Sequence, residues 1–186
     1  PEFTGRQNAF LEAQINGFSL KETLEFLPEI EEFADIAESE IAEVIEETLA
    51  PLSRKNGENP AKVVEDLRSM MQNKVGIIRT GELLEEALKE LEEFEIRSIK
   101  TSANGGRIYN PGWHQALEIG AMIDVSKMCA LAALRREESR GGHTRDDFPT
   151  PDHKHWGKIN SIIFKNDDGS MAIDYVTYPP IPDDLK

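Results

Sequence analysis

The chain has 186 residues, of which 39% are hydrophobic and 30% charged, and its formal net charge at pH 7 is −14. This composition is ordinary for a protein that can bury a core. No apolar run approaches the roughly 18–20 residues that a membrane-spanning helix needs, and no segment resembles a signal peptide. Because an acidic surface repels phosphates, the charge argues against non-specific binding of nucleic acid.

The first 55 residues contain most of the segments that are difficult to assign. Pro1-Glu2-Phe3 resembles a cloning scar, and the next residues favour a helix that Gly17 ends. Pro28 would interrupt any helix in the acidic segment that follows. From Glu38 onward, apolar residues recur every three or four positions and predict an amphipathic helix whose stripe is Ile41, Val44, Ile45, Thr48, Leu49 and Leu52.

Three further helices are predicted between residues 56 and 140. Asn59-Pro60 and Asn110-Pro111 each combine a preferred N-cap residue with proline at the first helical position, and Thr80 can cap the helix between them. The helix that starts at Pro111 and extends to about Glu138 is apolar on nearly all sides between residues 119 and 134. We therefore expect it to be the most buried helix, with the single Cys129 as a buried structural thiol, which suits a reducing compartment.

The apolar period changes near the C-terminus. "KINSIIFK" and "MAIDYVTY", separated by residues 166–170, predict a β-hairpin, and "YPPIPDD" predicts an extended end. A lone hairpin is only marginally stable, so it needs a surface on which to lie. The predicted fold is mainly α: a three- to four-helix antiparallel bundle, spectrin-repeat-like, with a C-terminal β-hairpin.

The segment "RREESRGGHTRDDFP", residues 135–149, combines four arginines, one histidine and four carboxylates around Gly141-Gly142. In one interpretation it is a cross-braced helix end, in which a glycine adopts the left-handed conformation and the arginines pair with nearby carboxylates. In another interpretation the guanidinium groups bind carboxylates or carbonyls of a second protein. The residues alone leave both interpretations open.

Other kinds of site find weaker support in the sequence. His143, His153 and His155 lie near several aspartates and could supply metal ligands, but the pattern is unspecific and its prolines are typical of a surface loop. Ser139 lacks the glycine-flanked turn of a catalytic nucleophile, and no phosphate-binding glycine motif is present. We therefore predict no metal site, no catalytic residue and no cofactor-binding residue in this chain.

Residues 56–178 resemble the C-terminal helical domain of the succinate dehydrogenase/fumarate reductase flavoprotein subunit. The resemblance is carried, in this order, by "MMQNKVGIIRTGELLEEAL", "YNPGWHQALEIG", "REESRGGHTRDDFP" and "HWGKINSIIF". "GRQNAFLEAQ", residues 5–14, is similar to the end of the flavin domain of that family. The arginine-rich motif of the family matches this chain at Arg136, Ser139, Arg140, Gly141, His143 and Arg145.

The residues and the resemblance together predict a division of the chain into four parts. Residues 1–3 are the cloning scar, and residues 4–55 are a remnant of the flavin-domain end plus an acidic helical linker. Residues 56–140 are the helical bundle domain, and residues 141–186 are the Arg/His loop, the hairpin and the proline-rich tail. The six matched motif residues are expected to dock partners and not to catalyse.

The resemblance also implies an activity and partners. The parent protein would be an FAD-dependent oxidoreductase that interconverts succinate and fumarate and passes electrons to an iron–sulfur subunit. Because the family holds FAD in an N-terminal domain, we expect the fragment to be inactive and to bind no FAD. The implied partners are the flavin-binding domain of the same subunit, the iron–sulfur subunit and, indirectly, the membrane anchor subunits, on the cytoplasmic, inner face of the cell membrane.

Two alternatives remain open. The chain could be an autonomous acidic helical protein-interaction module, or the tail of a flavoprotein similar to L-aspartate oxidase. The long hairpin and the ending "YPPIPDDLK" favour the dehydrogenase over the oxidase.

Overall fold

The computed structural model describes residues 38–179. The predicted cloning scar, the helix ending at Gly17, the segment that follows it and the proline-rich end from Pro180 lie outside the described residues. The chain divides into two compact units, residues 1–43 and 44–186, and the described part of the first unit is the start of one helix.

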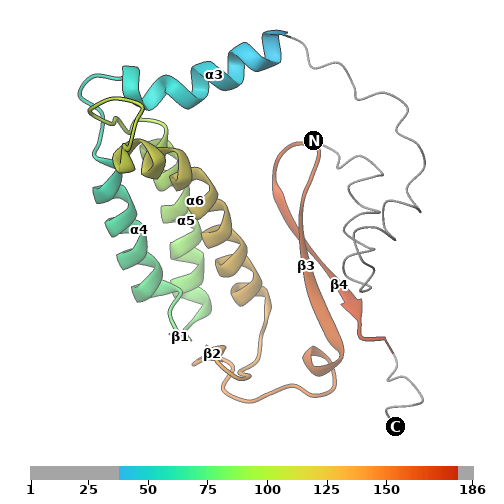
Figure 1. The fold of residues 1–186 in the computed structure, drawn as a ribbon. Coiled ribbons are helices and arrows are strands. Elements are labelled where there is room, and N and C mark those ends of the chain that lie inside the picture. The colour runs from blue at the N-terminus through green and yellow to red at the C-terminus, as the bar shows by residue number, and fades with distance from the viewer. Residues whose placement is uncertain (1–37, 180–186) are drawn as a thin grey trace, which may run out of the picture. The chain divides into compact units, whose positions relative to one another are not determined.

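The predicted fold class is confirmed: the described chain is mainly helical and ends in a β-hairpin (Figure 1). The helices are α3 (Glu38–Ser53), α4 (Pro60–Lys74), α5 (Gly81–Ser98) and α6 (Pro111–Arg135). The three predicted N-caps are confirmed, because the side chains of Asn59, Thr80 and Asn110 accept hydrogen bonds from N–H groups in the first turns of α4, α5 and α6.

The core lies between α4, α5 and α6, which run side by side in Figure 1. Each helix contributes one apolar stripe at helical spacing, as the sequence predicts. The buried core residues are Val63, Val64, Leu67, Met70, Ala87, Leu91, Phe94, Ile119, Ile123 and Ala130.

The prediction that α6 is the most buried helix is wrong, because six of its 25 residues are buried, against five of the 15 residues of α4. Only the face toward α4 and α5 contributes to the core, and the other face exposes Val125 and Met128, by 57% and 40%. Cys129 is also exposed, so the prediction of a buried structural thiol is wrong as well. In a bundle of three helices each helix meets its neighbours along one side, and this geometry leaves the outer side of an all-round apolar helix uncovered.

The loops that precede α4 and follow α5 are joined by backbone hydrogen bonds. Glu58 N–H donates to the Lys100 carbonyl over 3.1 Å, and Ser102 N–H donates to the Glu58 carbonyl over 3.0 Å. Gly57 lies in this contact, where a Cβ atom would come within 2.5 Å of the Lys100 oxygen. The close approach of the two loops therefore requires glycine at this position.

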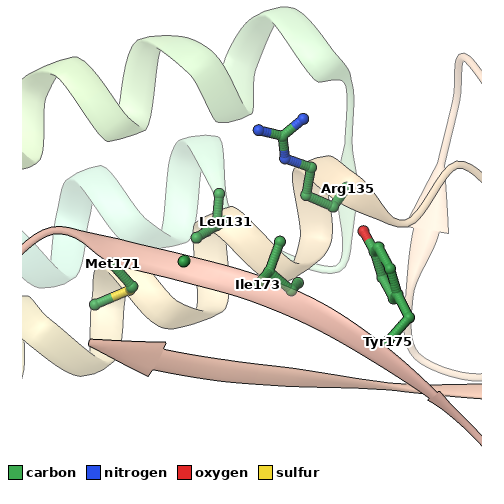
Figure 2. A pocket seen from close by; sticks show the side chains of 6 residues that line it. Leu131, Arg135, Met171, Ile173 and Tyr175 are labelled. Atoms are coloured by element: carbon green, nitrogen blue, oxygen red, sulfur yellow. The ribbon is translucent and has the colours of Figure 1, made fainter. Parts of the chain in front are cut away.

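The hairpin consists of β3 (Ile159–Lys165) and β4 (Met171–Thr177), paired antiparallel, and follows the 3-10 turn η1 (Trp156–Lys158). It lies beside the last turns of α6, which supply the surface that an isolated hairpin needs. Residues of α6 and β4 line a cavity of 390 Å³. Figure 2 shows Leu131 and Arg135 of α6 beside Met171, Ile173 and Tyr175 of β4. The Tyr175 ring also packs edge-on against Trp156, with ring centroids 5.5 Å apart.

A second, smaller sheet was not predicted. The two-residue strands β1 (Ile78–Arg79) and β2 (Thr144–Arg145) pair in parallel and join the start of α5 to the arginine-rich loop. Among residues 38–179, no helix is both long enough and apolar enough to cross a membrane.

Candidate docking site in the arginine-rich loop

The C-terminus of α6 is capped by an arginine side chain and not by glycine. The helix ends at Arg135, earlier than predicted, and Arg136 already has an extended backbone. The Nη1 of Arg145 donates to the carbonyl oxygens of Ala133 and Leu134, over 3.0 and 2.9 Å. These carbonyls have no partner within a helix end, so the guanidinium group supplies one and also places positive charge at the negative end of the helix dipole.

Gly141 has the predicted left-handed conformation, with φ of +59°, but not at the helix end. Arg140 and His143 exchange two backbone hydrogen bonds, of 2.8 and 3.0 Å, around the pair Gly141-Gly142. This is a two-residue hairpin turn, in which the first central residue needs positive φ. The prediction of a left-handed glycine is confirmed, whereas its assignment to the helix cap is wrong.

Arg145 connects three parts of the fold. It is 2% exposed, and its Nε and Nη2 donate to the two carboxylate oxygens of Asp147, each over 2.7 Å. Asp147 Oδ2 also accepts the N–H of Gly81, the first residue of α5, over 2.9 Å. The hydrogen bonds from Arg145 lower the pKa of Asp147 below its ordinary value, and the carboxylate stays charged. The loop thereby links the end of α6 to the beginning of α5.

Glu138 forms the centre of a second ion cluster. Its side chain is completely buried and accepts from Arg136 Nε and Nη2, over 2.9 and 2.6 Å, and from Arg140 Nε and Nη2, over 2.9 and 3.1 Å. The N–H of Asp152 donates to the same carboxylate over 2.6 Å. Burial raises the pKa of Glu138, but the hydrogen bonds from Arg140 and Arg136 outweigh burial and lower the pKa to about 2.

The remaining motif residues fix the backbone of the loop. Ser139 Oγ accepts the N–H of Arg145 over 2.9 Å and donates to the carbonyl of Phe148 over 2.8 Å. His143 Nε2 donates to the carbonyl of Arg136 over 3.0 Å. Burial lowers the pKa of His143, and the positive charges around it act in the same direction, so the neutral imidazole is favoured.

All six motif residues therefore have partners or roles within the described chain. The interpretation of a cross-braced helix end is confirmed, with Glu138 and Asp147 as the carboxylates. Glu138 and Asp147 were not among the predicted site residues. The sequence contained a signal that Glu138 pairs with arginine, since one arginine lies two residues before it and another lies two residues after it. A docking role for the loop stays a prediction.

Two further observations concern groups that could bind ions. Within residues 38–179, no cluster of three or more His, Cys, Asp or Glu residues is placed to hold a metal ion, and His153 and His155 are exposed. Arg79, which the sequence analysis did not single out, lies on β1 beside the loop, and its buried Nε has no hydrogen-bond acceptor.

The fold and the loop define a class: a helical domain whose longest helix within residues 38–179 leads into an internally paired arginine-rich loop. The family model described as "Fumarate reductase flavoprotein C-term" matches residues 64–183. The chain belongs to this family of flavoprotein C-terminal domains, and the resemblance inferred from its motifs is confirmed.

Individual relatives agree with the family match. The chain is 30% identical to the fumarate reductase flavoprotein subunit of Mycobacterium tuberculosis over 66% of its own length and 21% of that protein. It is 30% identical to the succinate dehydrogenase flavoprotein subunit of Coxiella burnetii over 76% of this chain and 24% of that one. It also matches the solved Mycobacterium smegmatis Sdh1 complex in the apo form, with a TM-score of 0.72 and 34% identity, over 88% of this chain and 28% of that one. The chain thus spans less than a third of each relative.

Proposed function

We propose that this chain is the C-terminal helical domain of an FAD-dependent succinate dehydrogenase/fumarate reductase flavoprotein subunit, in which it acts as a scaffold and docking domain. One observation carries the proposal: the matched residues 64–183 contain most of α4, all of α5 and α6, the arginine-rich loop and the hairpin. The motif that gives the resemblance is the same motif that holds α5, α6 and the loop together through Arg145 and Glu138.

The proposed activity belongs to the whole subunit: interconversion of succinate and fumarate through FAD, with electrons passing to an iron–sulfur subunit. The residues described do not fit FAD. The cavity beside the hairpin and a 550 Å³ groove between α4 and α6 are lined by side chains from helix interiors and β4, and neither has a glycine-rich turn at a helix N-terminus to bind a pyrophosphate. We therefore assign FAD to the remainder of the subunit and derive no chemical step in this domain.

The proposed partners are the flavin-binding domain of the same subunit and the iron–sulfur subunit, with membrane anchor subunits contacted indirectly and the complex placed on the cytoplasmic face of the membrane. The exposed apolar face of α6 supports the proposal that partners bind this domain, because contiguous exposed apolar side chains mark interaction surfaces. In the loop, Gly142 is exposed and a side chain added there would meet nothing within 4 Å, so this turn is available for contact.

Size-exclusion chromatography with the separately expressed flavin-binding domain and iron–sulfur subunit tests the proposal. We expect co-elution of the wild-type chain and its loss with Gly142→Arg, which adds bulk at the turn without touching the ion clusters. The matched control is Gly106→Arg, at an equally open glycine before the opposite end of α6. Arg140→Ala should weaken co-elution and also lower the melting temperature of the chain, because Arg140 pairs with the buried Glu138; only Gly142→Arg therefore tests docking separately from stability. Separate elution of well-folded partners would contradict the proposed function.

A further inference from the structure

Within residues 38–179 Arg79 has no counter-charge, unlike Arg136, Arg140 and Arg145 of the loop. In the parallel pair β1–β2 it lies directly opposite Arg145, and paired residues of neighbouring strands project to the same face of a sheet. Two like charges in this position repel each other. Arg145 is compensated by Asp147 and by the end of α6, whereas the described residues supply no acceptor for the buried Nε of Arg79.

The charge on Arg79 is correspondingly unfavourable in this chain. Burial lowers the pKa of Arg79, and the positive charge of Arg145 lowers it further. No carboxylate within residues 38–179 acts against this lowering. A half-buried guanidinium group without an anion costs free energy that a partner's carboxylate would recover, because guanidinium and carboxylate pair through two parallel hydrogen bonds.

The surroundings of Arg79 are suited to an extended segment. Thr144 and Asp146 donate to the carbonyls of Ile77 and Arg79, so β2 occupies one edge of β1. The backbone groups of Ile78 point to the other edge, where no described strand pairs. Ile77 and Ile78 are 69% and 64% exposed. Exposed apolar side chains therefore lie next to the open edge of β1 and to Arg79.

We propose that the edge of β1, residues 77–79, binds an extended segment of the flavin-binding part of the same subunit, with a carboxylate of that segment paired to Arg79. An added strand would satisfy the open edge of β1, and its apolar side chains would cover Ile77 and Ile78. This inference rests on the proposed function, because it requires the remainder of a flavoprotein subunit.

The chain length and charge favour a segment of the same subunit over a segment of another subunit and over a second copy of this chain. The chain spans 21–28% of the three relatives named above, and in them the remainder belongs to the same polypeptide. A covalently attached segment competes at high effective concentration with any segment from another subunit. A second copy of this chain is disfavoured, since each copy carries a net charge of −14.

The test measures two quantities for Arg79→Met: the melting temperature of the 186-residue chain and its Kd for the separately expressed, FAD-loaded remainder of the subunit, by calorimetry. We expect an unchanged or higher melting temperature, because an uncompensated cation is removed, together with binding weaker by roughly 30-fold or more. The matched control is Arg107→Met, at an exposed arginine in the loop before α6, which should change neither quantity.

The outcomes separate this inference from the proposed function. If the wild-type chain does not bind the flavin-loaded part, the proposed function itself fails. If the wild type binds and Arg79→Met binds equally well, only the role of Arg79 is overturned. Weaker binding of Arg79→Met to the iron–sulfur subunit, with unchanged binding to the flavin-loaded part, would assign the carboxylate to that subunit and also overturn the inference. A double-mutant cycle against each Asp or Glu of the flavin-binding part should identify one carboxylate coupled to Arg79.

Discussion

Replacing Glu138 by glutamine removes the charge at the centre of the loop while keeping the shape of the side chain. The wild-type carboxylate accepts four hydrogen bonds from the guanidinium groups of Arg136 and Arg140 and one from the N–H of Asp152. A glutamine offers one oxygen as acceptor and turns an N–H₂ group toward a donor. The substitution therefore leaves two arginines without their anion and at least one donor unpaired.

The magnitude follows from the burial of the three groups. Removing one partner of a fully buried ion pair costs about 3–5 kcal/mol. Glu138 is completely buried, but the side chains of Arg136 and Arg140 are 25% and 35% exposed, so water can solvate part of each guanidinium group. We therefore expect Glu138→Gln to lower the free energy of unfolding by about 2–3 kcal/mol.

Urea unfolding at pH 7, followed by far-ultraviolet circular dichroism, measures this change. With a slope of about 2 kcal/mol per molar, the midpoint should fall by ~1 M or more. Glu137→Gln is the matched control, because Glu137 is the exposed neighbour in the sequence and its substitution should change stability by less than about 0.5 kcal/mol. Equal midpoints for the wild type and Glu138→Gln would refute the reasoning that the buried carboxylate organises the loop.

The same substitution predicts a pH dependence. The pKa of Glu138 falls from the ordinary value of 4.5 to about 2 in the folded chain, so on acidification the unfolded chain takes up this proton first. The stability that the carboxylate contributes is therefore complete above pH 4.5 and is lost as the pH falls toward 2. The difference in stability between the wild type and Glu138→Gln should narrow over this interval, and a constant difference would contradict the assignment.

Three further substitutions have expected outcomes that the same unfolding assay checks. Gly141→Val should lower stability by about 1–2 kcal/mol because of the positive φ, whereas Gly142→Val, at a residue without positive φ, should have a much smaller effect. Gly57→Ala should lower stability by about 2 kcal/mol, since the new Cβ would lie 2.5 Å from a backbone carbonyl oxygen, and an unchanged midpoint would show that the loops can separate at little cost. Arg145→Lys should lower the free energy of unfolding by about 2–4 kcal/mol, because an ammonium group cannot pair with both oxygens of Asp147 and also cap α6. Unchanged stability of this variant would show that Arg145 does not cap the helix.

The helices were predictable because their signals are local. An asparagine followed by proline fixes the start of α4 and of α6, and apolar residues at helical spacing identify the face that each helix buries. The end of α6 was not predictable in this way. Arg136, Glu137 and Glu138 do not oppose helix formation by their propensities, and the helix stops because Arg145 takes the last carbonyls and Glu138 turns inward to two arginines. Those partners become neighbours only in the folded chain.

The exposure of α6 and the small sheet show a second limit of sequence reasoning. An apolar periodicity indicates which side chains avoid water, but not whether the element that covers them belongs to the same segment of chain. Val125, Met128 and Cys129 are apolar in sequence and exposed in this fold. The strands β1 and β2 have two residues each, too few for an alternating pattern to be recognised. For this reason the sequence did not indicate that Arg79 lies in a strand beside the loop.

The internal pairing of the loop decides which of its residues can test a docking role. Arg136, Ser139 and Arg145 hold the carboxylates and carbonyls of the chain itself, so their substitution would change the fold of the loop and the surface it presents at the same time. A loss of binding in such variants would not separate docking from stability. Gly142, which lies between two motif residues, and the edge of β1, which pairs with β2, make no such contribution to the ion clusters. The motif residues of the loop therefore fix its conformation. Substitutions at Gly142 and at the edge of β1 can change the binding of a partner without changing the stability of the loop.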